Sequence, residues 1–284
     1  MTGGASILLA LASSLCWGTA DFFGGLQSRY ATALAVAVFS QIAGGIGLAL
    51  VLLVLGAAPE QAALLWGIAG GICSGTGLLL FYRGLAAGVM SIVAPIAACG
   101  TLIPVAVSIA GGDSPTPVAL AGIVAALLGV LLVSRPAGGT SHPSGRPWFV
   151  LALALGSALC FGFFYVCLHA GAVASGQSLW VVGGARIGSL ATLLGIALVS
   201  RPPLRWPGRR IVPIAGVGVL DALANALFAI AALGGNLGVV SVLGSLYPVA
   251  TVVLARVLLA ERLARPQAAG VVLALAGVSM MSLG

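Results

Sequence analysis

Two ionisable residues and one amide lie inside long apolar stretches of this chain, where their chemistry is unusual. Arg186 and Asp221 carry charge, and Asn225 follows Asp221 by one helical turn, on the same face. A charge within a membrane-spanning helix is unfavourable by about 2.5–3.5 kcal/mol on insertion scales, so such a residue is a candidate for function. A guanidinium can bind a carboxylate through two hydrogen bonds, and a carboxyl group away from water can exchange a proton near neutral pH. These residues indicate either an anion site beside a titrating acid, or an ion pair that only joins two helices.

The depths of Arg186 and Asp221 along their apolar stretches allow the two side chains to meet. Arg186 lies in the stretch 177–200 and Asp221 in the next one, 211–233. Arg186 lies about 12 Å from the outer end of its stretch and Asp221 about 12 Å from the inner end of its own, at a rise of 1.5 Å per helical residue. In an apolar core of about 30 Å the two depths then differ by only about 6 Å. A pair near the membrane midplane is therefore predicted as possible, although contact depends on how the helices pack.

A pocket for a small organic solute needs apolar walls and a few convergent polar groups. Beside Arg186, Asp221 and Asn225, we expect its walls to come from one amide and five aromatic side chains, each of which helix packing could also explain: Trp17, Gln41, Tyr82, Phe161, Tyr165 and Tyr247. The other notable ionisable residues fall near the ends of apolar stretches, where solvation or pairing is expected: Asp21, Arg83, His169, Arg256 and Glu261.

The composition places these residues in a lipid environment. Only 6% of the residues are charged and 61% are hydrophobic, whereas a soluble domain has about 25% charged residues. The net charge of +7 comes from arginines between apolar runs, which is typical of membrane orientation and not of nucleic-acid binding. The five cysteines lie in apolar runs without a metal-ligand spacing, and there is no P-loop. We therefore expect a lipid bilayer as partner, and no cofactor, metal or nucleic acid.

The chain repeats itself. LALASSLCWG at 9–18 is matched by LALGSALCFG at 153–162, and GIVAALLGVLLVS at 122–134 by GVVLALAGVSMMS at 270–282. The first match, at an offset of 144, pairs Trp17 with Phe161, and an offset of 145 pairs Gln41 with Arg186. This duplication predicts two related halves, 1–134 and 148–284, joined by a Pro- and Gly-rich linker at 135–147.

Each half contains five stretches long enough to cross a membrane. We expect an all-α integral membrane protein with ten spans, at 5–25, 32–56, 62–83, 88–110, 116–134, 148–170, 177–200, 211–233, 237–259 and 265–283. Five spans per half place the second half in the opposite orientation, which is an inverted-topology repeat. All arginines except Arg186 then fall on the same side as the linker. The positive-inside rule puts that side in the cytoplasm and both termini outside.

Two segments resemble a known family. GVVSVLGSLYPVATVVLARVLLAERL at 238–263 and GLAAGVMSIVAP at 84–95 are similar to the repeat motifs of EamA-type transporters in the drug/metabolite transporter superfamily. The resemblance covers both halves and implies ten helices in two inverted repeats, with secondary transport of a small organic solute, usually outward. The first half has Gly111-Gly112 where the second has Glu261-Arg262. It also has Gln41 where members of the family often have arginine, so only the second half would supply Arg to a solute.

The expected function is therefore secondary transport, with export of small organic metabolites such as amino acids across the inner membrane of a bacterium by alternating access. Arg186 would bind a carboxylate on the solute, and Asp221 would carry a coupling proton. An uncoupled, channel-like uniporter is the first alternative. An intramembrane enzyme would need a nucleophile with its base, or a metal cluster, at membrane depth, and we expect no enzymatic activity. Nothing in the sequence requires an oligomer.

Overall fold

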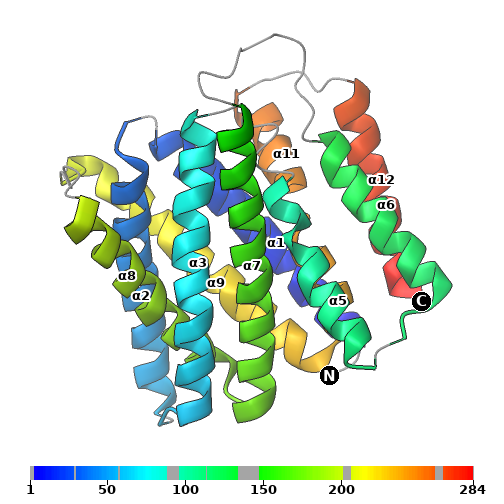
Figure 1. Ribbon diagram of the computed structural model, residues 1–284, viewed down its shortest axis with the longest axis horizontal. Helices are drawn as coiled ribbons and strands as arrows, with labels where there is room; N and C mark the ends of the chain where they lie inside the picture. Colours follow the sequence, from blue (N-terminus) through cyan, green and yellow to red (C-terminus); the bar gives the residue numbers. More distant parts are fainter. Residues whose placement is uncertain are drawn as a thin grey trace.

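The fold is that of a helical bundle, described here from a computed structural model (Figure 1). The structure describes residues 3–28, 30–56, 58–87, 96–112, 114–133, 147–200, 206–259 and 265–283. Within these residues the regular elements are all helices: α1 (Gly3–Gln27), α2 (Ala33–Leu55), α3 (Gln61–Ala87), η1 (Cys99–Thr101), α5 (Leu102–Ala110), α6 (Pro117–Val133), α7 (Pro147–Ser175), α8 (Ser178–Ser200), η2 (Gly208–Arg210), α9 (Ile211–Gly234), α10 (Leu237–Gly244), α11 (Tyr247–Leu259) and α12 (Arg265–Leu283).

Six described helices are long and apolar enough to cross a membrane, namely α1, α2, α3, α7, α8 and α9. Each coincides with one of the first three spans expected in a half. Four shorter apolar helical stretches, 96–110, 117–132, 237–251 and 268–277, fall within the fourth and fifth spans expected in each half. The chain is therefore an all-helical, multi-pass membrane protein.

The expected single helix at 237–259 is broken. α10 ends at Gly244 and α11 begins at Tyr247, because Pro248 has no N–H to donate and its ring would collide with the carbonyl of residue 244. The chain turns instead through Ser245, whose backbone N–H contacts the carbonyls of Ser241 and Val242 and whose Oγ donates to the Val242 carbonyl at 2.8 Å. The break places Tyr247 at the start of a new helix.

Local signals fix where other helices begin and end. Thr32 caps α2, since its side chain accepts from the N–H of Ala35 at 3.2 Å, and Gly56 ends that helix in the left-handed conformation at φ 65°. Asn236 caps α10 by accepting from the N–H of Val239 at 3.1 Å. The loop between α9 and α10 is consequently short.

The outer surface of the bundle is apolar and its interior holds the polar groups. Val54 and Val199 are 88% and 87% exposed, while Gln41, Arg186 and Asn225 are buried. In water this distribution would be strongly unfavourable, but lipid tails solvate the apolar surface.

Equivalent contacts recur when the two halves are exchanged. A side chain at Gly71 would meet the backbone of Ala185 and Ser189, and one at Gly218 would meet the backbone of Ser40 and Gly44. Ser40 and Ala185 are 145 residues apart, as are Gly44 and Ser189, and this is also the offset between Gln41 and Arg186. The packing therefore follows the repeat of the sequence, and helices of opposite halves face each other.

The last helices of the two halves also pack together. In Figure 1, α6 and α12 lie side by side at one edge of the bundle. A Cβ on Gly129 would lie 2.5 Å from the Ala274 nitrogen, and one on Gly277 would lie 2.6 Å from the Ala126 nitrogen. Gly129 and Gly277 are 148 residues apart, as are Ala126 and Ala274. Each helix therefore contacts the other through repeat-equivalent residues.

Candidate functional site

A ring of hydrogen bonds joins α2, α8 and α9 inside the bundle. Arg186 Nη1 lies 2.5 Å from Asp221 Oδ2 and donates to Gln41 Oε1 at 2.7 Å. Gln41 closes the ring through its Nε2, which donates to Asp221 Oδ2 at 3.2 Å. Ser189 Oγ also donates to Gln41 Oε1, at 2.9 Å. Arg186 and Asp221 thus form an ion pair, and Gln41 of the other half bridges it.

Gln41 suits this position because its amide has both an acceptor and a donor. The oxygen accepts from Arg186 and Ser189, and the NH₂ group donates to the carboxylate. An arginine at position 41 could donate but not accept, and it would face the guanidinium of Arg186. The amide therefore connects the first half to a charged pair made wholly within the second half.

Two glycines bring α2 and α9 close enough for this ring. Gly44 lies one turn from Gln41, and Gly218 lies one turn from Asp221. A Cβ at either glycine would collide with the backbone of the facing helix, at Gly218 for Gly44 and at Ser40 for Gly218. The helices thus approach backbone to backbone, which small residues make possible in membranes.

The two charged partners differ in exposure. The side chain of Arg186 is 6% exposed and that of Asp221 is 26% exposed. Nε and Nη2 of Arg186 are buried and have no hydrogen-bond partner among the described residues. Arg186 is therefore enclosed by protein behind the ring, whereas Asp221 borders open space.

That open space is a cavity of about 60 Å³ between the halves. Seven of the residues expected at the site line it, from both halves: Trp17, Gln41, Phe161, Tyr165, Asp221, Asn225 and Tyr247. Arg186 is not among the lining residues, and the Tyr82 side chain lies outside the described residues. Five further residues complete the wall: Asp21, Ser74, Leu78, Phe81 and Phe164.

Asp21 is the most consequential addition, because we expected it at a helix end. It lies in the cavity wall on α1, one turn after Trp17. That i, i+4 spacing was the available signal, since residues one turn apart share a helix face. Its repeat partner, at the offset of 144, is Tyr165, which also lines the cavity.

Aromatic rings form half of the described cavity lining. The ring centroids of Trp17 and Tyr165 are 5.5 Å apart, and those of Tyr165 and Phe228 are 4.8 Å apart. Trp17 also contacts Phe228, at 5.6 Å. These three rings are buried, as is Tyr247. Trp17, Tyr165 and Tyr247 line the cavity, and Phe228 packs against the first two of them.

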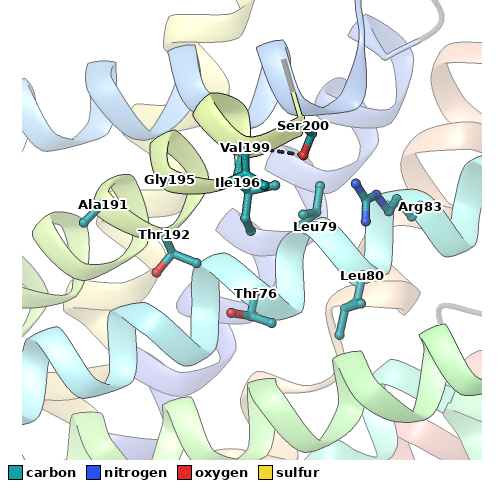
Figure 2. Close-up of a pocket in the computed structure, with 10 residues that line it drawn as sticks. All are labelled: Thr76, Leu79, Leu80, Arg83, Ala191, Thr192, Gly195, Ile196, Val199 and Ser200. Carbon is teal, nitrogen blue, oxygen red and sulfur yellow. Dashed lines mark hydrogen bonds between the residues drawn. The ribbon is translucent and has the colours of Figure 1, made fainter. Parts of the chain in front are cut away.

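A larger groove, of about 510 Å³, lies between α3 and α8 (Figure 2). Figure 2 shows Arg83 and Ser200 toward one end of the groove and Ala191 toward the other. The hydroxyls of Thr192 and Ser200 donate to carbonyls of their own helix, at 2.8 and 2.6 Å. Among the described residues that line the groove, no hydrogen bond or ion pair joins α3 to α8, so the central cavity with its bridged ion pair is the better candidate site.

Other polar groups have structural roles. His169 Nδ1 lies 2.9 Å from the carbonyl oxygen of Ala232 and ties α7 to α9. Ser13 Oγ donates to the Ala224 carbonyl at 2.8 Å and ties α1 to α9. Across the described residues, no group of three or more His, Cys, Asp or Glu side chains converges as a metal site.

Comparisons with known proteins agree with this architecture. The model of the EamA-like transporter family matches residues 4–135 and 148–283, one copy in each half. A solved structure, titled only "Crystal structure of protein", superposes with a TM-score of 0.82 at 17% sequence identity, covering 99% of this chain and 97% of that one. That likeness concerns the fold alone. No curated protein sequence matches the chain.

Proposed function

Because the chain belongs to the EamA-like transporter family, we propose that it is a secondary transporter that exports a small organic metabolite, such as an amino acid, across the bacterial inner membrane. The observation that carries this proposal is the bridged ion pair beside a small cavity lined largely by aromatic residues, with walls from both halves. Polar groups are rare at membrane depth, and in transporters they mark the solute pathway.

The proposed membrane arrangement is ten spans in two inverted repeats, with both termini outside the cytoplasm. The contacts that recur on exchange of the halves support a pseudo-two-fold axis between them. The arginines on one side of the expected topology support the orientation. Alternating access would then be a rocking of one half against the other around the cavity.

The size of the cavity indicates a closed conformation. About 60 Å³ is far below the roughly 300–1,000 Å³ of pockets that hold small organic molecules. To admit a metabolite the halves must separate, and the bonds of Gln41 to Arg186 and Asp221 cross that boundary. These bonds are therefore the proposed lock of the closed state.

Protonation of Asp221 is the proposed step that opens the hydrogen-bonded ring between the halves. A proton would remove the negative charge that holds Arg186 Nη1 and would loosen the ring. The guanidinium, whose Nε and Nη2 lack partners among the described residues, would then bind a carboxylate on the solute through a two-bond fork. Arg186 is accordingly the proposed anion anchor and Asp221 the proposed coupling group.

Reconstitution tests this proposal directly. Proteoliposomes that contain the purified protein should take up labelled amino acids faster than protein-free vesicles, and an imposed pH gradient should change the rate. The Arg186→Ala variant is the matched negative control. Equal uptake by the parent and by this variant, at equal protein content, would show that Arg186 holds the helices together and does not bind solute.

A further inference from the structure

We propose that Asp21, Asn225 and the aromatic rings around them form a subsite for an ammonium group, so that the solute carries a protonated amine. This inference rests on the proposed transport function and specifies the chemistry that the cavity selects. It assigns Asp21 a role in solute binding on the α1 side of the cavity.

The charges that border the cavity are negative and only partly balanced. Asp21 and Asp221 line it, and no arginine or histidine is found among its described lining residues. Asp221 is paired with Arg186, while Asp21 has no ion pair or hydrogen bond with another described residue. The cavity therefore has one unbalanced carboxylate in an apolar setting, and a cation would balance it.

Asn225 adds an acceptor in the same wall. Its residue is only 5% exposed, and its Nδ2 donates to the backbone carbonyl of Asp221 at 2.7 Å. That bond settles the orientation of the amide, since a carbonyl can only accept. Oδ1 is left buried without a partner among the described residues. An unpaired buried acceptor is unfavourable. Asn225 lines the cavity, and an N–H donor there would satisfy Oδ1 once the wall moves to admit the solute.

An ammonium group fits this set of groups better than the alternatives. It has three N–H donors for the oxygens of Asp21 and Asn225, and its positive charge is attracted to the faces of Trp17, Tyr165 and Tyr247. A hard metal cation requires a shell of oxygen ligands, which an aromatic wall does not provide. A carboxylate alone would be repelled by Asp21 and Asp221, and no arginine or histidine among the described lining residues would offset that repulsion.

The cavity volume agrees with a head-group site. About 60 Å³ exceeds the roughly 10–15 Å³ that one water-sized sphere needs. This space accommodates an ammonium group, while the rest of an amine-bearing metabolite requires the cavity to widen. An ammonium group and a proton would also compete for Asp21, so binding should weaken as the pH falls.

Thermal unfolding of the purified protein, with three probes of similar size at equal ionic strength, tests the subsite. Propylammonium should raise the unfolding temperature in a saturable way, because it binds the native state. Propionate and 1-propanol should have smaller effects. Asp21→Asn should weaken the apparent affinity for propylammonium by about thirtyfold or more, as expected when one partner of a buried charged contact is removed. Asn225→Ala should weaken it by about tenfold or more, for the loss of one hydrogen bond to a charged group.

Glu60→Gln is the matched control. It also removes one carboxylate, but Glu60 is exposed and is not among the residues that line the cavity, so the response to propylammonium should stay at the parent value. Equal stabilisation by all three probes, or by sodium as well as propylammonium, would overturn the proposal. If Asp21→Asn fails to fold, the probe comparison on the parent and the Asn225→Ala variant decide in its place.

Uptake into proteoliposomes separates this inference from the proposed function. Binding of propylammonium with no transport of any solute would refute the transport function and leave the subsite standing. Transport of an amine-free solute, at equal rates by the parent and by Asp21→Asn, would refute the subsite and leave the transport function standing. Loss of amine transport in Asp21→Asn, with the parent rate kept in Glu60→Gln, is the expected result.

Discussion

Replacing Gly218 by alanine should separate α2 from α9 and open the ring between the halves. A Cβ at Gly218 would collide with the carbonyl oxygen of Ser40 and would lie 2.7 Å from its carbon and 3.0 Å from the Gly44 nitrogen. All three atoms belong to the backbone, so no side-chain rotation can relieve the contact, and the helices must move apart. Gln41 lies one turn from Gly44, and its bond to Asp221 is already 3.2 Å long. A separation of α2 from α9 by a few tenths of an ångström would therefore break this bond.

The size of the effect follows from the type of contact. Overpacking of a tight interior is unfavourable by about 1–3 kcal/mol. On the relation found for domains of 150–250 residues, this corresponds to a fall of roughly 2–12 °C in unfolding temperature. Transport should fall more steeply, because the polar ring depends on the helix separation.

Gly216→Ala is the control for this prediction. Gly216 is in the same helix, and a Cβ there meets nothing within 4 Å. This substitution should leave the unfolding temperature unchanged or raise it slightly, since alanine favours helix over glycine. Both variants should be measured by fluorescence-detected unfolding and by uptake into proteoliposomes. If the two variants have equal unfolding temperatures and equal transport rates, the close approach of α2 and α9 does not position the site.

Three further predictions concern the proposed mechanism and orientation. Arg186→Lys keeps the charge but loses the two-bond fork, so uptake into proteoliposomes should drop by about tenfold or more while the protein still folds; a parent-like rate would remove Arg186 from solute binding. Asp221→Asn should leave solute binding measurable by thermal stabilisation but abolish the response of uptake to a pH gradient; an unchanged response would place coupling elsewhere or indicate a uniporter. In a cysteine-free background, an impermeant thiol reagent should label a cysteine at position 60 in intact cells and one at position 209 only after lysis; the opposite pattern would reverse the orientation.

The sequence by itself determined the class of the protein. The low charge content, the apolar stretches and the repeat at offsets of 144 and 145 are properties of the chain that need no coordinates. They predicted a helical membrane protein built from two related halves, and the prediction of an EamA-type transporter is confirmed by the family match in both halves. These features are visible in the sequence because each spanning helix must by itself match the apolar thickness of the bilayer and satisfy its own backbone hydrogen bonds.

Only the tertiary structure decided which polar groups meet. The depths of Arg186 and Asp221 allowed a pair, but contact required a particular rotation of α8 and α9, and the bridge from Gln41 required the close approach at Gly218. The placement of Asp21 in the cavity wall and of Arg186 behind it depends on the same packing. Helical period assigns residues to a face of one helix, but which face turns inward is set by contacts with helices far away in the chain.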